Sequence, residues 1–451
     1  LHVSRIWKYV RKKKKIRKYI RLFIVFVVVL IFVFAVFVTL KNTVLKPSFL
    51  KNVSYDNYVS IKYYDIYGTH LNFKGEFENK DNLSNLKLIL KDNDKEITIP
   101  WEINENNNKI EFKTSDYINE GISLESLTKG TYYLLVKGQA EDEDIYYPLE
   151  NNTEYDNLEY YTLTKNGKNN KIDITWDNYE GNEILKFQIK NTSLPNDVYD
   201  ITIDPGHDAN DTGKLACSNG SPVTNSGLCK TGTLYKESDV NLALAKEIKN
   251  QLENQGYKVK LTRENEKDTL PTYGHMGSAT TANDTKSKFN LAIHHNSSGI
   301  SGGSSYLKGL ELYIANDSSL DLAKLFVKNI TEYANTQTSP KTQDKIKDGI
   351  YQRFFTEEEI NEEENPPANK STNTIYYYAI REVGGIATHA YNDGRYDNLD
   401  KNPYYNSNNT AESYLFEMGY LDDVQDLKNI NNNKEGYAKG IVTALSEYLE
   451  N

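Results

Sequence analysis

The fold is decided by the stretch Tyr199-Asp-Ile-Thr-Ile-Asp-Pro-Gly-His207, in which a short strand pattern runs into a turn that ends on a histidine. After this stretch, predicted strands alternate with predicted helices, which is the pattern of an α/β domain. The first helix is marked by apolar residues that recur every four positions, and Gly256 can terminate it. These residues are Val240, Leu244, Ile248 and Leu252. The sequence therefore predicts an α/β domain that begins near residue 199.

The remaining elements of this domain follow from the same patterns. Strands are expected at 257–261, 289–293, 310–314 and 414–416. A second helix is expected from Leu320 to Ile330, with Ser318 or Ser319 as its N-cap, and a last helix closes the chain.

Four polar residues fall at the predicted ends of these elements, where α/β folds expose their sites. His207 follows the first strand, and Glu237 precedes the first long helix. His294 ends the strand at 289–293, and Glu417 ends the last strand. Two neutral imidazoles and one carboxylate make a ligand set that leaves one zinc position open for water, as in catalytic zinc sites.

Such a set suits the hydrolysis of an amide. With one carboxylate ligand, zinc keeps a net charge near +1, which lowers the pKa of bound water and polarises a carbonyl oxygen. A carboxylate that is not bound to the metal must take the proton of the water and return it to the departing amine. Glu417 is the candidate for this role.

A series of motifs in this region resembles the zinc-dependent N-acetylmuramoyl-L-alanine amidase family, which includes the bacterial autolysins and sporulation amidases. The resemblance covers residues 199–450, with all motifs in family order. They are Ile203-Asp-Pro-Gly-His207, Glu237-Ser-Asp-Val-Asn-Leu242, Thr262-Arg263, Ala282-Asn283, Ile293-His294-His-Asn296 and Leu415-Phe-Glu417-Met-Gly419.

The resemblance implies a twisted mixed sheet flanked by helices. It also implies that His207, Glu237 and His294 bind Zn²⁺ and that Glu417 is the general base and acid. The implied reaction cleaves the amide between the lactyl group of N-acetylmuramic acid and L-alanine of the peptidoglycan stem peptide. A zinc peptidase acting on stem peptides, or a catalytically silent wall-binding or scaffold protein, is the alternative.

The sequence departs from the family pattern in three places. The stretch between His207 and Glu237 is longer than usual, Ser278 stands where an arginine is expected, and residues 339–375 form a long insertion. Some relatives block the zinc with an inserted helix until an activator protein binds. The acidic residues at 357–364 have the chemistry for such a block, so autoinhibition by residues 340–373 is a hypothesis.

The other histidines of this domain carry weaker signals. His295 is expected on the opposite face of its strand from His294, in the core or supporting the site. His275 and His389 match no motif, and contact of His389 with substrate is the less favoured interpretation.

The N-terminal part predicts a membrane anchor. Leu22 to Leu40 is apolar and uncharged, which is long enough for a transmembrane helix. All ten charged residues in the segment 1–21 are basic, so this end is expected in the cytoplasm and everything after Leu40 outside the cell membrane. The chain has 53 Lys and Arg against 63 Asp and Glu, and with those ten set aside the remainder is strongly acidic and does not suit nucleic acid.

Residues 48–195 predict an extracellular β-rich, sandwich-like domain. Short runs rich in Tyr, Ile, Val and Thr are separated by Asn, Asp and Gly, and no helix pattern stands out. This region lacks a cluster of metal-ligand residue types, so we expect it to space the catalytic domain, 199–451, from the membrane or to bind wall polymer. The two cysteines, Cys217 and Cys229, lie in the predicted exterior, where a disulfide can persist, but the sequence leaves their pairing open.

Overall fold

The fold was analysed in a computed structural model. The structure describes residues 26, 27, 29, 47–114, 121–141, 143–150, 157–164, 167–179, 182–273, 275–300, 306–315, 318–362, 371–384 and 411–450. The chain separates into two compact units. Of the described residues, one unit holds 26, 27, 29, 47–53 and 92–95 with the 3₁₀ helix η1 (Ser48–Asn52), and the other unit holds the remaining ones.

The α/β domain is built on a mixed sheet of seven strands in the order β16-β13-β17-β21-β18-β20-β19. The first four strands run parallel, β18 is antiparallel to β21, and β19 is antiparallel to β20. Their bounds are β13 (Ile201–Pro205), β16 (Val259–Leu261), β17 (Phe289–Asn296), β18 (Glu311–Ile314), β19 (Lys345–Lys347), β20 (Ile350–Tyr351) and β21 (Glu412–Tyr420). The predicted mixed sheet flanked by helices is confirmed.

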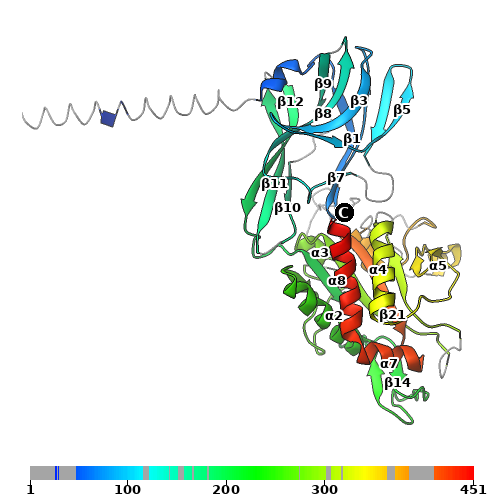
Figure 1. The fold of residues 1–451 in the computed structure, drawn as a ribbon. Coiled ribbons are helices and arrows are strands. Elements are labelled where there is room, and N and C mark those ends of the chain that lie inside the picture. The colour runs from blue at the N-terminus through cyan, green and yellow to red at the C-terminus, as the bar shows by residue number, and fades with distance from the viewer. Residues whose placement is uncertain are drawn as a thin grey trace, which may run out of the picture. The chain divides into compact units, whose positions relative to one another are not determined.

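Three long helices pack together beside this sheet, with α8 between α2 and α4 (Figure 1). Their bounds are α2 (Glu237–Asn254), α4 (Leu320–Tyr333) and α8 (Lys434–Glu450). The apolar stripe predicted on the first helix is buried, and Ser319 caps α4 by accepting a hydrogen bond from the Leu322 backbone. The shorter helices are α3 (Thr281–Asp284), α5 (Glu357–Glu362), α6 (Tyr378–Gly384) and α7 (Val424–Asn432).

Three predicted strand ends were wrong. The strand expected to end at Ile203 is β13, which ends at Pro205. His294 lies inside β17, which continues to Asn296, and Glu417 lies inside β21, which continues to Tyr420. Every residue of β21 is buried. A polar residue in this strand therefore does not indicate where the strand ends. The ladder between β17 and β21 shifts register between His294 and Asn296, which is typical of a β-bulge.

The predicted β-rich region has the expected strand content. Its strands form one hydrogen-bonded sheet of twelve, because β9 pairs with both β8 and β1, and both halves of that sheet contribute to one apolar core. The bounds are β1 (Val59–Tyr67), β2 (His70–Glu78), β3 (Ser84–Lys91), β4 (Glu96–Ile99), β5 (Glu102–Asn106), β6 (Lys109–Lys113), β7 (Ile122–Ser123), β8 (Gly130–Ala140), β9 (Glu143–Glu150), β10 (Leu158–Tyr161), β11 (Asn169–Tyr179) and β12 (Asn182–Thr192). Seven of the twelve tyrosines that the structure describes in this region are buried, as expected of ordinary strand residues.

The predicted transmembrane segment, 22–40, lies outside the described residues except for positions 26, 27 and 29. Among the residues that the structure describes, no helix is both long and apolar enough to cross a membrane. His389 also lies outside the described residues.

Candidate metal centre

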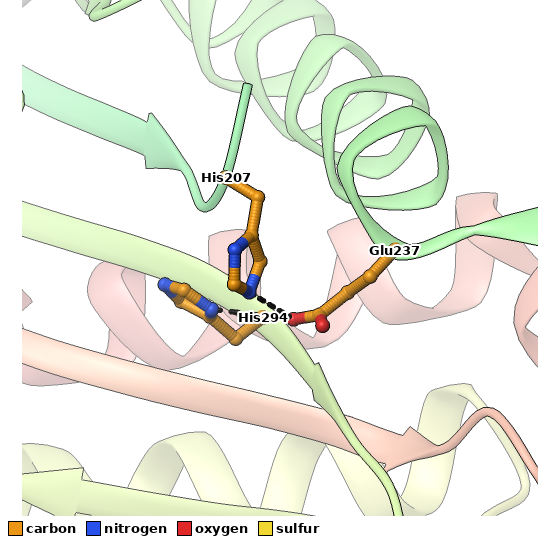
Figure 2. Close-up of side chains that lie close together, drawn as sticks. All are labelled: His207, Glu237 and His294. Carbon is orange, nitrogen blue, oxygen red and sulfur yellow. Dashed lines mark hydrogen bonds and ion pairs between the residues drawn. The ribbon is translucent and has the colours of Figure 1, made fainter. Parts of the chain in front are cut away.

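Three side chains from three different elements meet near the carboxyl ends of the neighbouring strands β13 and β17. His207 follows β13, Glu237 is the first residue of α2, and His294 lies on β17. Figure 2 shows the three side chains pointing toward one another. Each offers a ligand atom within 4.8 Å of those of the other two, and this is the group found for a metal ion in the described part of the chain.

The carboxylate of Glu237 lies between the two imidazoles. Its Oε1 is 3.1 Å from Nε2 of His207 and 3.3 Å from Nδ1 of His294. Glu237 is buried, whereas the two histidine side chains keep 24% and 16% of their surface exposed, so the group opens to solvent on the histidine side. A small ligand can therefore reach it.

The charges of His207 and Glu237 depend on one another. Burial lowers the pKa of His207, but its hydrogen bonds with Glu237 and Asp211 outweigh burial and raise that pKa to about 9. Burial raises the pKa of Glu237, yet the two histidines outweigh it and hold the pKa well below the ordinary value. A metal ion and protons therefore compete for the same atoms of these side chains.

The backbone around His207 is specialised for this position. His207 has a φ of +62°, a conformation that costs free energy for a residue other than glycine. Gly206 must be glycine because a Cβ there would lie 2.2 Å from the His294 ring. The Asp-Pro-Gly-His turn therefore brings its backbone against the second histidine.

Buried polar contacts hold that turn in place. Arg263 is 2% exposed and donates to the carbonyl oxygens of Pro205, Gly206 and Ser238 at 3.1, 3.3 and 2.6 Å. Asn241 also donates to the Gly206 carbonyl, at 2.9 Å. The turn and the start of α2 are thereby tied together.

His295 has the supporting place predicted for it. It is buried, and its Nδ1 lies 2.6 Å from Oδ1 of Asn241, the residue that holds Gly206. Burial lowers the pKa of His295 to about 3, so its imidazole is neutral. His275, in contrast, has a side chain that is 76% exposed and lies 3.4 Å from Asp284, away from the three ligands.

Glu417 lies beside this group but is not one of its three members. It is the residue of β21 that pairs with His294 of β17. Its Oε2 is buried and has no hydrogen-bond partner among the described residues. Burial raises the pKa of Glu417 well above its ordinary value, and the charges of Glu237 and Glu311 raise it further.

A second buried carboxylate, Glu311, was missed by sequence reasoning. It pairs with Glu417 across β18 and β21 and is fully buried. Tyr313 donates to it at 2.7 Å, Tyr420 donates to its other oxygen, and Lys341 forms an ion pair with it at 3.6 Å. No local pattern signals this network, because its members come from three separate stretches of the chain.

Two histidines and a carboxylate, with a further carboxylate on the neighbouring strand, are the residue types that metal-dependent hydrolases use. More than half of the chain, residues 201–447, matches the model of the N-acetylmuramoyl-L-alanine amidase family, and the chain belongs to that family. It is accordingly an enzyme that acts as a peptidoglycan amidase, as the sequence predicted.

Solved structures of such amidases are among the similar proteins. An N-acetylmuramoyl-L-alanine amidase from Clostridium difficile 630 shares 21% identity over 56% of this chain and 98% of its own, with a TM-score of 0.34. The catalytic domain of CwlV from Bacillus (Paenibacillus) polymyxa var. colistinus shares 21% over 56% and 99%, with a TM-score of 0.34. The CwlD amidase from Clostridioides difficile, solved in complex with the GerS lipoprotein, shares 17% over 56% and 98%, with a TM-score of 0.32. A comparison with curated proteins gives no match.

Proposed function

We propose that this chain hydrolyses, with zinc, the amide between the lactyl group of N-acetylmuramic acid and L-alanine of the peptidoglycan stem peptide. The observation that carries the proposal is the convergence of His207, Glu237 and His294, with Glu417 beside His294 in the neighbouring strand. Family membership supplies the substrate class.

The residues present fit zinc. A donor set of two imidazole nitrogens and one carboxylate is a catalytic zinc set with room for a further ligand. When bound, zinc supplies a Lewis acid that polarises the amide carbonyl and activates water at neutral pH. The zinc ligands would be His207, Glu237 and His294. Because Glu237 is buried, water does not compete with the metal ion for its carboxylate.

Glu417 is proposed as the general base and acid. Its raised pKa matches the task of accepting a proton from the attacking water and then giving it to the departing amine. The products are then a free lactyl carboxylate and a peptide with an L-alanine amino terminus. Glu311, held by its tyrosines, would help to keep the pKa of Glu417 raised through its own negative charge.

The location of the enzyme is part of the proposal. The apolar segment 22–40 and the basic residues before it support a single-pass anchor, with the N-terminus cytoplasmic and the catalytic domain, 199–451, outside the cell membrane. The β-rich region, 48–195, would then lie between the anchor and the catalytic domain and space it from the membrane.

Control by an activator protein stays a prediction. The acidic helix α5 begins with a capping box in which Thr356 and Glu359 exchange hydrogen bonds, and Glu359 also pairs with Arg353. Glu359 is thus engaged away from the three candidate ligands. If residues 340–373 block the site, deleting them should raise the rate of wall digestion, and an unchanged rate would dismiss the block.

The experiment for the function is digestion of purified peptidoglycan by the purified chain. The expected result is new L-alanine amino termini, identified by mass spectrometry, which disappear with a zinc chelator and return when zinc is added. A shortened stem peptide instead would show a peptidase. No release from any wall preparation, by zinc-loaded chain, would favour a binding or scaffold role.

A further inference from the structure

The segment between His207 and Glu237, which is longer than the family pattern, forms a disulfide-closed hairpin. β14 (Leu215–Cys217) pairs antiparallel with β15 (Leu234–Lys236), and β15 runs directly into Glu237. Cys217 and Cys229 are joined by a disulfide. The hairpin thus begins just after one candidate zinc ligand and ends at another.

The first part of this hairpin, Asp211–Lys214, touches both ligands. Oδ2 of Asp211 accepts a hydrogen bond from Nδ1 of His207 at 2.8 Å, on the ring atom away from Glu237. The backbone N–H of Lys214 donates to Oε2 of Glu237 at 2.9 Å, on the oxygen that faces away from His207. We call residues Asp211–Lys214 the strap. It forms a hydrogen bond with the atom of each ligand that faces away from the other ligand.

The strap is also bonded to the start of α2. The Glu237 backbone N–H donates to the Lys214 carbonyl at 2.9 Å, and the Ser238 N–H donates to the Thr212 carbonyl at 3.2 Å. Two of the helix N–H groups that have no partner inside α2 are satisfied in this way. Movement of the strap would therefore displace the Glu237 backbone as well as its side chain.

The packing between strap and ligands leaves no spare room. Gly213 lies at the centre of the strap with a φ of +64°, and a Cβ there would be 2.6 Å from Oε2 of Glu237 and 2.6 Å from Cδ2 of His207. The strap is fitted to the ligand atoms rather than lying loosely over them.

The β-ladder that anchors the strap is short. β14 and β15 pair at only three positions, and a two-stranded ribbon of that length is marginal in water. The disulfide lies at the far end of this ladder, next to the hydrogen bond from Ser218 to the Thr233 carbonyl. The disulfide closes the hairpin and so stabilises it in place of further paired strand residues.

We propose that this disulfide-closed hairpin is a positioning device for the metal ligands: the strap orients His207 and Glu237, and Cys217–Cys229 keeps the strap in place. Partners that orient a ligand from outside are worth about 10- to 100-fold in metal affinity. Opening the disulfide should therefore weaken zinc binding without removing any ligand. The inference rests on the proposed zinc site and deepens it.

The test is zinc affinity, measured by competition with a chromophoric chelator, on the full chain and four variants. Asp211→Ala should lose about 10- to 100-fold in affinity and Asp211→Asn, which keeps an acceptor, should lose less. The double variant C217S/C229S should lose about 10-fold, the lower end of the same range. Asp321→Ala, which removes an exposed carboxylate from α4, is the matched control and should bind zinc as the unaltered chain does.

The outcomes are distinct. Equal affinity in the unaltered chain, Asp211→Ala and the double cysteine variant would overturn the inference and leave the zinc enzyme intact. Absence of zinc binding by the unaltered chain would overturn both the zinc site and the inference. If the double cysteine variant does not fold, as judged by circular dichroism, the two Asp211 variants decide, because they leave the disulfide in place.

Discussion

The two halves of the candidate site are supported in different ways. His294 and Glu417 lie on β17 and β21, which are neighbouring interior strands of the sheet with buried faces. His207 and Glu237 lie on a turn and a helix start, and they are held by a hairpin and by buried polar contacts. Apolar packing fixes one half, whereas hydrogen bonds and a disulfide fix the other.

This difference predicts which variants affect which property. The sheet half, His294 and Glu417, carries the proposed proton-transfer residue. The geometry of this half depends on the core of the whole domain. The loop half, His207 and Glu237, carries two of the three proposed zinc ligands. The geometry of this half depends on a few local contacts. Zinc affinity should therefore be most sensitive to changes in the loop half.

The largest effect is expected from Glu417→Gln. The amide keeps the size of the side chain but cannot accept the proton of the water, so the rate of wall digestion should fall by about 100- to 10,000-fold. Zinc affinity should stay unchanged, because Glu417 is not one of the three ligands. If zinc affinity falls together with the rate of wall digestion, the two halves of the site do not act independently.

A large effect on zinc affinity is expected from Gly213→Ala. Its Cβ would press on both Glu237 and His207, so affinity should fall by up to about 100-fold. Gly227→Ala is the matched control, because Gly227 lies in the same hairpin with a φ of +72° but its Cβ would meet only Leu215 at 3.8 Å. If both variants lose affinity equally, backbone strain and not ligand contact is the cause.

A smaller effect, on stability, is expected from Arg263→Lys. An ammonium group cannot reach the three carbonyl oxygens that the guanidinium serves, so the free energy of unfolding should drop by about 2 kcal/mol. Urea unfolding measures this. An unchanged midpoint would mean that the turn before His207 is held by other contacts.

At neutral pH the smallest effect is the pH dependence of stability that comes from His295. Its folded pKa of about 3 is depressed below the ordinary 6.5, so its contribution to stability is complete above pH 6.5 and is lost as pH falls toward 3. The unfolded chain binds the extra proton in this window, so the slope contributed is at most about 1.4 kcal/mol per pH unit. His295→Gln should flatten the acid side of the stability curve, and an unaltered slope would contradict this account.

Sequence reasoning reached the main strands and the three long helices in order, and also the four residues of the proposed site, because those residues carry local patterns. The strand expected at 199–203 and found at Ile201–Pro205 is local with its turn, and so is the helix that begins at Glu237. It placed His294 and Glu417 at strand ends, since the length of a fully buried strand has no alternating pattern to show where it stops.

The supporting contacts were not accessible in the same way. Glu311 lies far from Glu417 in sequence, and the strands that bring them together are antiparallel neighbours in a register that local patterns do not encode. The disulfide was left open for the same reason, because spacing alone does not fix how the hairpin pairs. Asp211 could have been noticed four residues after His207, but nothing in its surroundings marks it as a partner of the imidazole.

The most direct test of the account is to locate zinc in crystals of the zinc-loaded chain by anomalous diffraction at the zinc edge. We predict one strong peak bounded by His207, Glu237 and His294, with Glu417 near it but not bound to it. A peak at other residues, or none at these three in protein that digests peptidoglycan, would contradict the account.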